Sequence, residues 1–491
     1  MKLRELYNID SDVEITGVEI NSKTCKQGDI FVCVSGATAD RHDYIDDAID
    51  HGVSAVVVSK DVGEKSVPII KVDNTDDELP KLCQKVFDYP NQKLKMIGVT
   101  GTDGKTSVST IIQTLLGDDI CGYIGTNGIS SKNVHEDNPN TTPAPNLLYK
   151  VLGEFYDTGC KYASIEASSE AFFNGRLKYL EFDAAILTNV TSEHLNTHGT
   201  FENYLDCKLN LFRQTKEDGI CVVNKDDEHA DAFIKEANGR VVTYGKDKDN
   251  TLVIDSFEIF KDHTEINFIY NDETIFINSP MLGDFNVYNL AAAFLTLLEL
   301  GINRDHIMNN IKNISVNGRL AMIDTHSNYY VMVDYAHTPN GIYNLLNFVK
   351  TLKLNSSIVV IGQAGERDAY KRPEVGKVVL ENADYAIFTY EDPRSEDPAK
   401  ICEDIVRDIK DKYQNYEIVI DRKEAINKAI NMAKENDIVL ILGKGNETYQ
   451  KLKDKVIHFN DIEEAKLAIN NRNNKNIWYN EKNGGIIYGW K

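Results

Sequence analysis

A glycine-rich segment between a predicted strand and a predicted helix constrains this chain more than any other feature. Residues 96–100 (MIGVT) form a short apolar run typical of a buried strand, and residues 107–116 (SVSTIIQTLL) have the pattern of a helix. Residues 101–107 between them read GTDGKTS. Glycines let backbone N–H groups approach a phosphate, and a helix N-terminus favours an anion. The segment therefore predicts an α/β unit with a phosphate-binding loop.

Individual residues of this loop have expected roles. Lys105 would reach the terminal phosphates of a nucleotide, and Thr106 or Ser107 would hold Mg²⁺. The spacing departs from the common P-loop, because that motif requires a glycine where this chain has Val99. The alternative is a glycine-rich turn with an exposed lysine, but the flanking strand and helix favour the phosphate loop.

Strand-like and helix-like segments alternate along most of the chain, which is typical of the α/β class. Apolar runs such as residues 30–34 (IFVCV) and 437–443 (DIVLILG) have the length of buried strands, so we expect mostly parallel sheets. A chain of 491 residues suggests about three domains. We place them at residues 1–92, 93–316 and 317–470, followed by a surface tail over residues 471–491.

The charge of the chain excludes one class of function. Lys and Arg number 54 and Asp and Glu 76, so the formal net charge is −22. Binders of nucleic acid or anionic membranes need excess cations, so we expect no nucleic-acid partner. The charge also argues against polyanionic small substrates, although more weakly, because a site needs only local charge. The N-terminus has no signal-peptide core, no run approaches ~18 apolar residues, and the eight cysteines form no CxxC pair. We therefore expect a cytoplasmic protein without membrane insertion.

Two further polar residues follow predicted strands. Glu166 ends the strand at residues 162–167 (YASIEA), and His194 comes after the strand at residues 184–190 (AAILTNV). Ligand sites of α/β proteins form at the carboxyl ends of parallel strands, where the glycine-rich loop also lies. A carboxylate there suits a second Mg²⁺, and an imidazole could bind metal or phosphate. Taken alone, Glu166 would be interpreted as a surface acid and His194 as a strand-end histidine. Their position beside the glycine-rich loop favours a shared site.

The chain resembles the Mur ligases through a series of motifs in the order of that family, from residue 21 to about residue 461. Within the family it is most similar to the ligases that add the third amino acid to the UDP-N-acetylmuramoyl dipeptide. The motifs are GVTGTDGKTS, NTTPAP, IEASSEAFFNGRL, LTNVTSEHLNTHGTFENYLDCKLNLF, GDFNVYNLAAA, VNGRL, VDYAHTP, AGERDAYKRP and LGKGNETYQ.

The resemblance implies a fold and a reaction. The three domains would be a UDP-sugar-binding domain, a central P-loop-type ATPase and a C-terminal Rossmann-like domain that brings the amino acid. ATP would phosphorylate the terminal carboxylate of the muramoyl dipeptide, and an amine would then displace phosphate from the acyl phosphate. Mg²⁺ and lysines would neutralise charge on the transferred phosphoryl group.

The resemblance also implies residue roles at the ATP end. Lys105, Glu166, His194 and Lys208 would be catalytic. The residues expected to bind ATP are Gly101, Thr102, Asp103, Gly104, Lys105, Thr106, Ser107, Asn286, Asn289, Arg319, Asp334, Tyr335 and His337. The expected metal ligands are Thr106, Ser107, Glu166, His194 and Lys208, the last as a carbamoylated lysine. Without that modification, Lys208 would be a cation on a helix face.

At the acceptor end, the resemblance assigns the UDP-muramoyl dipeptide to Ser22, Thr141, Thr142, Ser168, Asn174 and Arg176. Some neighbouring residues depart from the family pattern. Asn174 stands where a glutamine is usual, and the triplet around Ser22 reads NSK instead of DSR. A lysine there keeps the charge but loses the planar fork of arginine.

The match weakens at the amino-acid end. The expected contacts are Arg367, Glu391, Asp392, Pro393, Arg394, Gly443 and Glu447. The family motif for diaminopimelate is DNPR, whose arginine would bind the distal carboxylate, and here it reads EDPR. The second carboxylate of this motif suits an extra amine, whereas an arginine facing the ammonium of lysine would be costly. Glu170 replaces a histidine, Asn446 replaces another, and Gln363-Ala364 replaces a Cys-Gly pair. We favour meso-diaminopimelate over L-lysine, with ornithine or another diamino acid, or a paralogue with an altered acceptor, left open.

Other function classes fit less well. A regulatory protein on an inactive ligase scaffold would be expected to lose the loop, Glu166, His194 or Lys208, and this chain has them all. A P-loop kinase or switch GTPase would leave the C-terminal domain unexplained. A folylpolyglutamate-type ligase would lack the N-terminal QGDIFVCVSG block and the TTP element. We therefore predict an ADP-forming acid–amino-acid ligase that acts as a monomer on ATP, a UDP-muramoyl peptide and a diamino acid, in peptidoglycan precursor synthesis.

Overall fold

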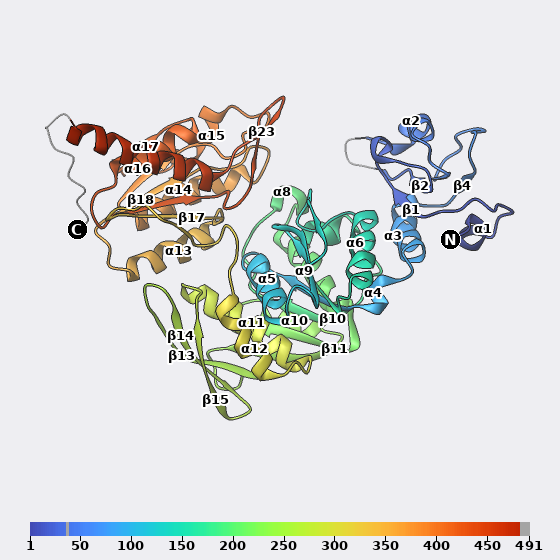
Figure 1. The fold of residues 1–491 in the computed structure, drawn as a ribbon, viewed down its shortest axis with the longest axis horizontal. Helices are drawn as coiled ribbons and strands as arrows, with labels where there is room; N and C mark the ends of the chain where they lie inside the picture. Colours follow the sequence, from blue (N-terminus) through green and yellow to red (C-terminus); the bar gives the residue numbers. More distant parts are fainter. Residues whose placement is uncertain (36–38, 482–491) are drawn as a thin grey trace.

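The computed structural model describes residues 1–35 and 39–481. Three sheets follow one another along the chain, each with its own helices, and we call the resulting parts the N-terminal, central and C-terminal units. Figure 1 shows the N-terminal unit (blue) and the C-terminal unit (orange and red) on opposite sides of the central unit. The sheets are mostly parallel, and the predicted α/β class is confirmed.

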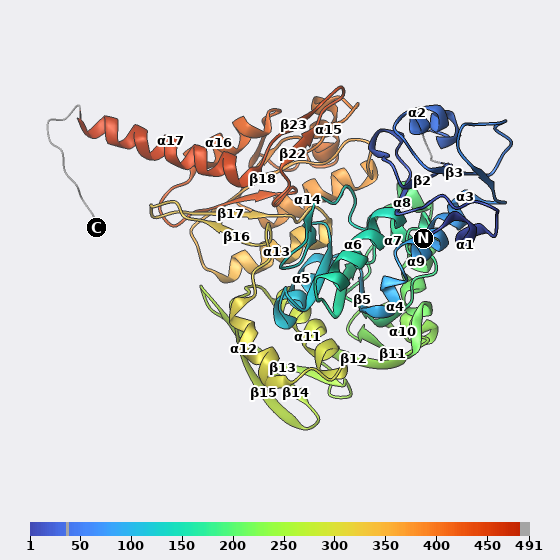
Figure 2. The same ribbon diagram turned by 45° about the vertical axis from the view of Figure 1, so that its right-hand side comes forward.

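The N-terminal unit is built on a parallel sheet with the order β1-β2-β3-β4. Its strands are β1 Gly17–Glu19, β2 Asp29–Val32, β3 Ala55–Val58 and β4 Ile69–Lys71, and its helices are α1 Leu3–Tyr7, η1 Ser22–Thr24, η2 Arg41–Tyr44, α2 Ile45–Asp50, α3 Thr75–Val86 and α4 Pro90–Lys93. The Asn74 side chain caps α3 by accepting hydrogen bonds from two backbone N–H groups of its first turn. Leu79 and Leu82 of α3 share a hydrophobic core with Leu148 and Leu152 of the central unit. Figure 2 shows the N-terminal unit beside the central unit.

The central unit carries an 11-stranded sheet of order β15-β14-β13-β12-β11-β10-β5-β9-β6-β7-β8. The strands are β5 Lys95–Thr100, β6 Cys121–Gly125, β7 Gly128–Ser130, β8 His135–Glu136, β9 Tyr162–Glu166, β10 Phe182–Leu187, β11 Thr215–Asn224, β12 Arg240–Gly245, β13 Leu252–Ile259, β14 Thr264–Tyr270 and β15 Glu273–Ser279. The helices are α5 Lys105–Leu116, α6 Pro145–Asp157, α7 Ser169–Phe173, α8 Leu195–His198, α9 Phe201–Arg213, α10 Ala230–Glu236, α11 Asp284–Glu299, α12 Arg304–Asn310 and η3 Ile311–Asn313.

Gly98 in the middle of β5 lets α9 approach the sheet. A Cβ at this position would lie 2.5 Å from Leu211 Cδ1 of α9 and 2.9 Å from the ring of Phe182. Real Cβ atoms do not approach other heavy atoms so closely, so any larger residue would push the helix away. This close packing sets the height of α9 above β5 and of the Lys208 side chain that the helix carries.

The C-terminal unit has a six-stranded sheet of order β16-β17-β21-β18-β19-β20, in which only β16 is antiparallel to its neighbour. Its strands are β16 Ala321–Ile323, β17 Tyr330–Asp334, β18 Ser357–Ile361, β19 Tyr385–Phe388, β20 Tyr416–Ile418 and β21 Ile438–Leu442, with a separate pair β22 Tyr449–Lys451 and β23 Val456–His458. The helices are α13 Pro339–Thr351, η4 Ala369–Lys371, α14 Arg372–Asn382, α15 Pro398–Val406, α16 Arg422–Met432 and α17 Asp461–Glu481. Alternate residues of the inner strands β17, β18, β19 and β21 face two separate cores, so the sheet is covered on both sides.

Two predicted boundaries fall inside helices. Residue 92 falls inside the short helix α4, and residue 470 falls inside α17, which continues to Glu481. The expected surface tail therefore begins as a helix that packs on the unit: Arg472 donates hydrogen bonds to the carbonyls of Ile430 and Ala433, and its guanidinium lies 4.3 Å from the centre of the Tyr329 ring. Residues 482–491 of that prediction lie outside the described residues. Among the helices that the structure describes, none combines the length and apolarity that crossing a membrane requires.

Candidate active site

The glycine-rich loop joins β5 to α5 at the middle of the central sheet, because β5 pairs with β10 on one side and β9 on the other. Gly101 has a φ of +151°, and a Cβ there would lie 1.8 Å from Thr188 Oγ1. Lys105, the first residue of α5, folds back over the loop: its Nζ donates hydrogen bonds to Gly101 O at 2.9 Å and Thr102 O at 2.8 Å. The ammonium is thus held over the loop that is expected to bind phosphate.

Lys208 reaches the same loop from α9. Its Nζ donates a 2.6 Å hydrogen bond to Gly101 O, and only 1% of the residue is exposed. Burial, followed by the nearby charge of Lys105, holds the pKa of Lys208 well below its usual range. Tyr204 lies between helix and loop, with its ring centre 4.5 Å from the lysine Nζ and its hydroxyl 2.9 Å from Thr102 Oγ1. Two lysines therefore share one carbonyl at the start of the loop.

Glu166, the last residue of β9, is completely buried beside the start of α5. One carboxylate oxygen accepts hydrogen bonds from Tyr123 OH at 2.6 Å and Thr126 N at 2.9 Å. The other accepts from Thr106 Oγ1 at 3.0 Å and Thr126 Oγ1 at 3.2 Å. These donors fix the carboxylate against Thr106, next to the phosphate loop.

His194 precedes α8 in a left-handed conformation, with a φ of +55°. The segment that carries it is tied to the phosphate loop, because Thr191 N donates to Thr102 Oγ1 at 2.8 Å. The Nδ1 atom of His194 is buried and has no hydrogen-bond partner among the described residues. Burial lowers the pKa of the imidazole, and the neighbouring carboxylates of Glu193 and Glu170 oppose that shift.

A cluster of charges from two units surrounds His194, and sequence reasoning missed three of its members, Glu193, Asp368 and Lys371. Glu193 Oε1 of the central unit lies 3.2 Å from Lys371 Nζ and 3.3 Å from His337 Nε2 of the C-terminal unit. Asp368 accepts hydrogen bonds from the backbone N–H groups of His194 at 2.8 Å and Asn196 at 3.2 Å. The motifs SEH and GERDAYKRP contained these three residues, but no spacing rule joins segments so far apart in the sequence.

The remaining residues expected at the nucleotide lie at the contact between the central and C-terminal units. Arg319 Nη2 lies 3.5 Å from Thr106 Oγ1, and its guanidinium carbon lies 4.5 Å from the centre of the Tyr335 ring. The Thr338 hydroxyl donates to Asp103 at 3.2 Å, and Asp334 accepts backbone hydrogen bonds at both oxygens. At the start of α11, Asn289 Nδ2 donates to Asn286 Oδ1 at 2.9 Å, and Ser107 is buried in the first turn of α5.

The residues expected at the acceptor form a connected group around the end of β9, with one exception. Thr142 Oγ1 donates to Glu166 O at 2.6 Å and lies 3.1 Å from Ser168 Oγ. Arg176 Nη1 donates to Thr142 O at 3.0 Å. Thr141 Oγ1 lies 3.2 Å from Thr126 Oγ1, and the Asn174 amide bonds the backbone of its own helix. Ser22 is separate, because it is buried in η1 of the N-terminal unit.

The residues expected at the amino acid lie in the C-terminal unit, and two of them are already paired. Lys444 Nζ donates to Asp392 Oδ1 at 2.9 Å and to Glu447 Oε2 at 2.7 Å. One carboxylate oxygen of Asp392 is therefore already occupied by Lys444, and the contact of Asp392 with a substrate amine stays a prediction. Arg394 has a φ of +53°, follows Pro393, and its buried Nε has no hydrogen-bond partner among the described residues. Burial raises the pKa of Glu391, which lies beside Gly443, to about 7.

Comparisons with known proteins identify the family. Residues 14–95 match the model of the Mur ligase family, catalytic domain, residues 99–297 that of the Mur ligase middle domain, and residues 318–445 that of the Mur ligase, glutamate ligase domain. A UDP-N-acetylmuramoyl-L-alanyl-D-glutamate–2,6-diaminopimelate ligase of Clostridium perfringens is 37% identical over 94% of this chain and 96% of its own length. The chain belongs to the Mur ligase family. It is accordingly an ATP-dependent, ADP-forming amide ligase, and the resemblance inferred from its motifs is confirmed.

Other relatives of this Mur ligase agree. A ligase of the same name from Bacillus cereus is 36% identical over 94% of this chain and 95% of its own length. A solved structure of a diaminopimelate ligase has a TM-score of 0.64 at 28% identity and covers 96% of this chain and 99% of its own. The MurF ligase of Thermotoga maritima, solved with ADP, has a TM-score of 0.69 at 19% identity over 95% of this chain and all of its own, which shows the shared fold.

The side chains of this ligase fit a magnesium ion that is completed by its substrates. Thr106 and Glu166 offer a hydroxyl and a carboxylate beside the phosphate loop, and His194 Nδ1 is a buried nitrogen without a partner among the described residues. No group of three or more His, Cys, Asp or Glu side chains suited to a metal occurs in residues 1–35 and 39–481. Mg²⁺ commonly binds one or two carboxylates together with phosphates and waters, which this donor set allows.

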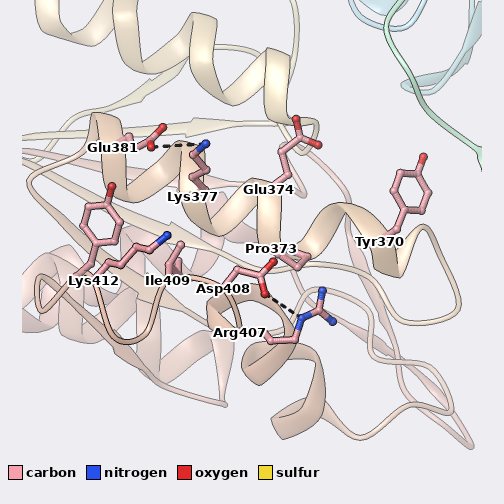
Figure 3. A pocket seen from close by; sticks show the side chains of 10 residues that line it. Tyr370, Pro373, Glu374, Lys377, Glu381, Arg407, Asp408, Ile409 and Lys412 are labelled. Carbon is pink, nitrogen blue, oxygen red and sulfur yellow. Dashed lines mark hydrogen bonds and ion pairs between the residues drawn. The ribbon is translucent and has the colours of Figure 1, made fainter.

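A separate surface pocket of about 340 Å³ lies on the C-terminal unit of the ligase, along α14 and the turn that follows α15 (Figure 3). Charged pairs border it: Arg407 Nε lies 3.3 Å from Asp408 Oδ1, and Lys377 Nζ lies 3.9 Å from Glu381 Oε1. None of the residues expected to bind a substrate lines this pocket. The candidate site is instead assembled from groups on facing units.

Proposed function

We propose that this ligase adds meso-diaminopimelate to UDP-N-acetylmuramoyl-L-alanyl-D-glutamate in peptidoglycan precursor synthesis. The observation that carries the proposal is that a carboxylate, the phosphate loop and an arginine of another unit meet at Thr106. Its hydroxyl bonds Glu166, its helix begins at the phosphate loop, and the guanidinium of Arg319 approaches it from the C-terminal unit. Curated relatives 36–37% identical over 94% of the chain carry the name of this reaction, which supports the same substrates here.

The proposed reaction has two steps. The dipeptide carboxylate attacks the terminal phosphorus of ATP, which forms an acyl phosphate and releases ADP. The amine of the incoming amino acid then attacks the acyl carbon, loses a proton, and displaces phosphate. Mg²⁺, held by Glu166, Thr106 and His194, would supply positive charge to the phosphoryl oxygens.

In the first step, the Lys105 ammonium would donate hydrogen bonds to phosphate oxygens in place of the loop carbonyls that it contacts here. Arg319 and the N-terminus of α5 would add further positive charge where the phosphoryl group moves. Thr142, Ser168 and Arg176 would hold the dipeptide beside Glu166. Ser22 would meet the uridine diphosphate end, so the acceptor would extend from the central unit to the N-terminal unit.

We further propose that Lys208 functions as a carbamate. Its buried amine has a lowered pKa, so it is held in the neutral form that can attack CO₂ with loss of a proton. The product would place a negative charge next to Lys105, where the unmodified amine is neutral. We expect Lys208→Ala to lose most activity and to regain part of it when short carboxylic acids are added. A wild-type rate in the unsupplemented variant would contradict the carbamate.

Arg394 supports diaminopimelate over lysine. Its guanidinium is available for the distal carboxylate of diaminopimelate, and the neighbouring Asp392 is neutralised by Lys444. The distal end of lysine carries only an ammonium, which the arginine would repel. We also propose that the three units are domains that divide near residues 92 and 316, with the last domain continuing through α17.

Phosphate release with a panel of amino acids tests the proposed function. We expect ATP turnover only when UDP-muramoyl dipeptide and diaminopimelate are both present, and at least tenfold slower turnover with lysine or ornithine. Arg394→Ala should abolish the preference for diaminopimelate. Turnover with lysine alone would overturn the amino-acid assignment. No turnover with any diamino acid, together with turnover on a folate, would overturn the whole proposal in favour of a folylpolyglutamate-type ligase.

A further inference from the structure

We infer that Glu170 binds the α-ammonium of the incoming amino acid, beside Arg367, which the family resemblance already assigns to the same substrate. The inference rests on the proposed function and deepens it, because it gives a role to Glu170. This glutamate replaces a histidine of the family pattern. Glu170 lies in the first turn of α7 in the central unit. Arg367 lies in the segment between β18 and η4 of the C-terminal unit.

The two side chains meet across the contact between the units. Arg367 Nη1 lies 3.4 Å from Glu170 Oε1, and the side chains are 42% and 30% exposed. Glu366 adopts a left-handed conformation with a φ of +55°, and it precedes Arg367 directly. On the other side of the arginine, Asp368 accepts the backbone N–H of His194 at 2.8 Å. The backbone next to Arg367 is thus anchored to the segment that carries His194.

Each member of the pair has an unused polar edge. Glu170 Oε1 accepts the Thr197 hydroxyl at 3.3 Å in addition to Arg367, and it lies 3.9 Å from His194 Nδ1. Within residues 1–35 and 39–481, Glu170 Oε2 accepts no hydrogen bond, and Nε and Nη2 of Arg367 donate none. One acceptor oxygen of Glu170 and one edge of the Arg367 guanidinium are therefore without a partner among these residues.

This combination matches the charges of an amino acid. An α-amino acid carries a carboxylate and an ammonium on the same carbon, so it needs a cationic and an anionic partner within a few ångströms of each other. The free edge of a guanidinium binds a carboxylate through two parallel hydrogen bonds. The free carboxylate oxygen of Glu170 can accept an ammonium hydrogen at the same time.

A purely structural role explains the pair less well. An exposed ion pair of this kind contributes about 0–1 kcal/mol, which is little for a contact between two domains. The buried charges of Glu193 and Lys371 already connect the same two units at 3.2 Å. The position of Glu170 beside His194 instead places the amine of the substrate close to the residues expected to handle the phosphoryl group.

Steady-state kinetics of three variants test the inference. Glu170→Gln keeps the shape of the side chain and removes its charge, and Glu170→Asp keeps the charge on a shorter side chain. Glu181→Gln is the matched control, because Glu181 is an exposed carboxylate of the central unit. We expect Glu170→Gln to raise the KM for diaminopimelate at least tenfold and to change the KM values for ATP and UDP-muramoyl dipeptide less than twofold. Glu170→Asp should recover part of the loss, and Glu181→Gln should match the wild type.

Two results would overturn the inference. The first is an unchanged KM for diaminopimelate in Glu170→Gln, and the second is an equal rise in all three KM values, which would mean that the pair only holds the domains together. Thermal unfolding of each variant checks that it is folded. Calorimetric titration of diaminopimelate into enzyme loaded with a non-hydrolysable ATP analogue and UDP-muramoyl dipeptide should give the same at least tenfold loss of affinity.

The wild-type enzyme separates this inference from the proposed function. If the wild type shows no turnover with any diamino acid, the proposed function and the inference both fail. If the wild type turns over diaminopimelate and Glu170→Gln has the same KM, the proposed function stands and only the role of Glu170 fails.

Discussion

Lys444 is completely buried and nevertheless carries an ammonium, because carboxylates surround it. Its Nζ contacts Asp392 and Glu447 at 2.9 and 2.7 Å, and these neighbours together with Glu391 raise its pKa. Burial raises the pKa of Glu391 to about 7. A raised pKa favours the charged form of the lysine but the neutral form of the glutamate. The cluster shows that residue type alone does not decide which carboxylate at the amino-acid end is free.

This arrangement predicts a pH dependence of stability. The pKa of Glu391 is about 7 in the folded protein against an ordinary value of 4.5. Between these values the folded state binds the proton more tightly than the unfolded chain, so the contribution of Glu391 to stability is lost as the pH rises. Glu391→Gln removes this titration. Its free energy of unfolding should therefore increase relative to the wild type from pH 4.5 to 7, by on the order of 1–3 kcal/mol, and then level off.

Urea unfolding at a series of pH values measures this difference in the enzyme without substrates. Glu181→Gln is again the control and should follow the wild type at every pH. A difference between Glu391→Gln and wild type that does not change with pH would contradict the raised pKa.

The sequence predicted some site residues and missed others for a physical reason. Glu166 and His194 were predictable, because each follows an apolar run and strand ends of a parallel sheet gather at one edge. The contacts of Glu193 with His337 and Lys371 were not, because they depend on how two separately folded units pack. The pairing of Asp392 with Lys444 is similar, since the two residues lie in separate loops that follow β19 and β21.

At the scale of elements, the start of α5 depends on the conformation of the loop before it. Gly101 combines a φ of +151° with the lack of space for a Cβ, which would meet Thr188 Oγ1 at 1.8 Å. Gly101→Ala should therefore displace the loop, lower the free energy of unfolding by roughly 2–4 kcal/mol, and reduce ATP turnover at least 100-fold.

Gly153 provides the matched control, because it lies inside α6 with no heavy atom within 4 Å of an added Cβ. Gly153→Ala should raise the free energy of unfolding by roughly 0.5–1 kcal/mol, as alanine is the better helix former. Thermal unfolding and phosphate release measure both variants. Near-wild-type turnover in Gly101→Ala would contradict the proposed role of the loop.

Most elements were predictable from their patterns, but the last helix was not. The strands of the central and C-terminal sheets are short apolar runs with turns between them, and such runs are a strong signal. Residues 471–476 read NRNNKN, and asparagine is a weak helix former that suggested a tail. The helix extends there because tertiary contacts outweigh propensity: the Arg472 guanidinium binds free carbonyls at the end of α16 and packs on Tyr329.

At the scale of the whole molecule, the site exists only while the central and C-terminal units are in contact. Glu193 is the buried anion of that contact, only 5% exposed, and its cationic neighbours hold its pKa well below the usual range in spite of its burial. Asp368, Thr338 and Arg319 add further contacts across the same boundary.

Glu193→Gln should weaken this contact. Lys371 would lose Glu193 and keep Asp368 as a carboxylate partner at the boundary. Breaking a buried ion pair in this way costs on the order of 3 kcal/mol. We expect a larger radius of gyration in small-angle X-ray scattering and an increased KM for the amino acid. Glu236→Gln is the control, since it breaks an ion pair of 2.7 Å between Glu236 and Arg213 within the central unit. An unchanged scattering profile in Glu193→Gln would contradict a role in holding the units together.

The position of β21 has a consequence for biosynthesis. It lies between β17 and β18 in the sheet, but it comes last of the six strands in the sequence. A ribosome that adds about 5–20 residues per second therefore releases β17 and β18 well before the strand that pairs with both. During that interval the nascent chain exposes two unpaired strand edges, which are prone to aggregate. Gly443, Lys444 and Glu447 follow β21 directly, so the amino-acid end of the candidate site is the last part of that site to be synthesised.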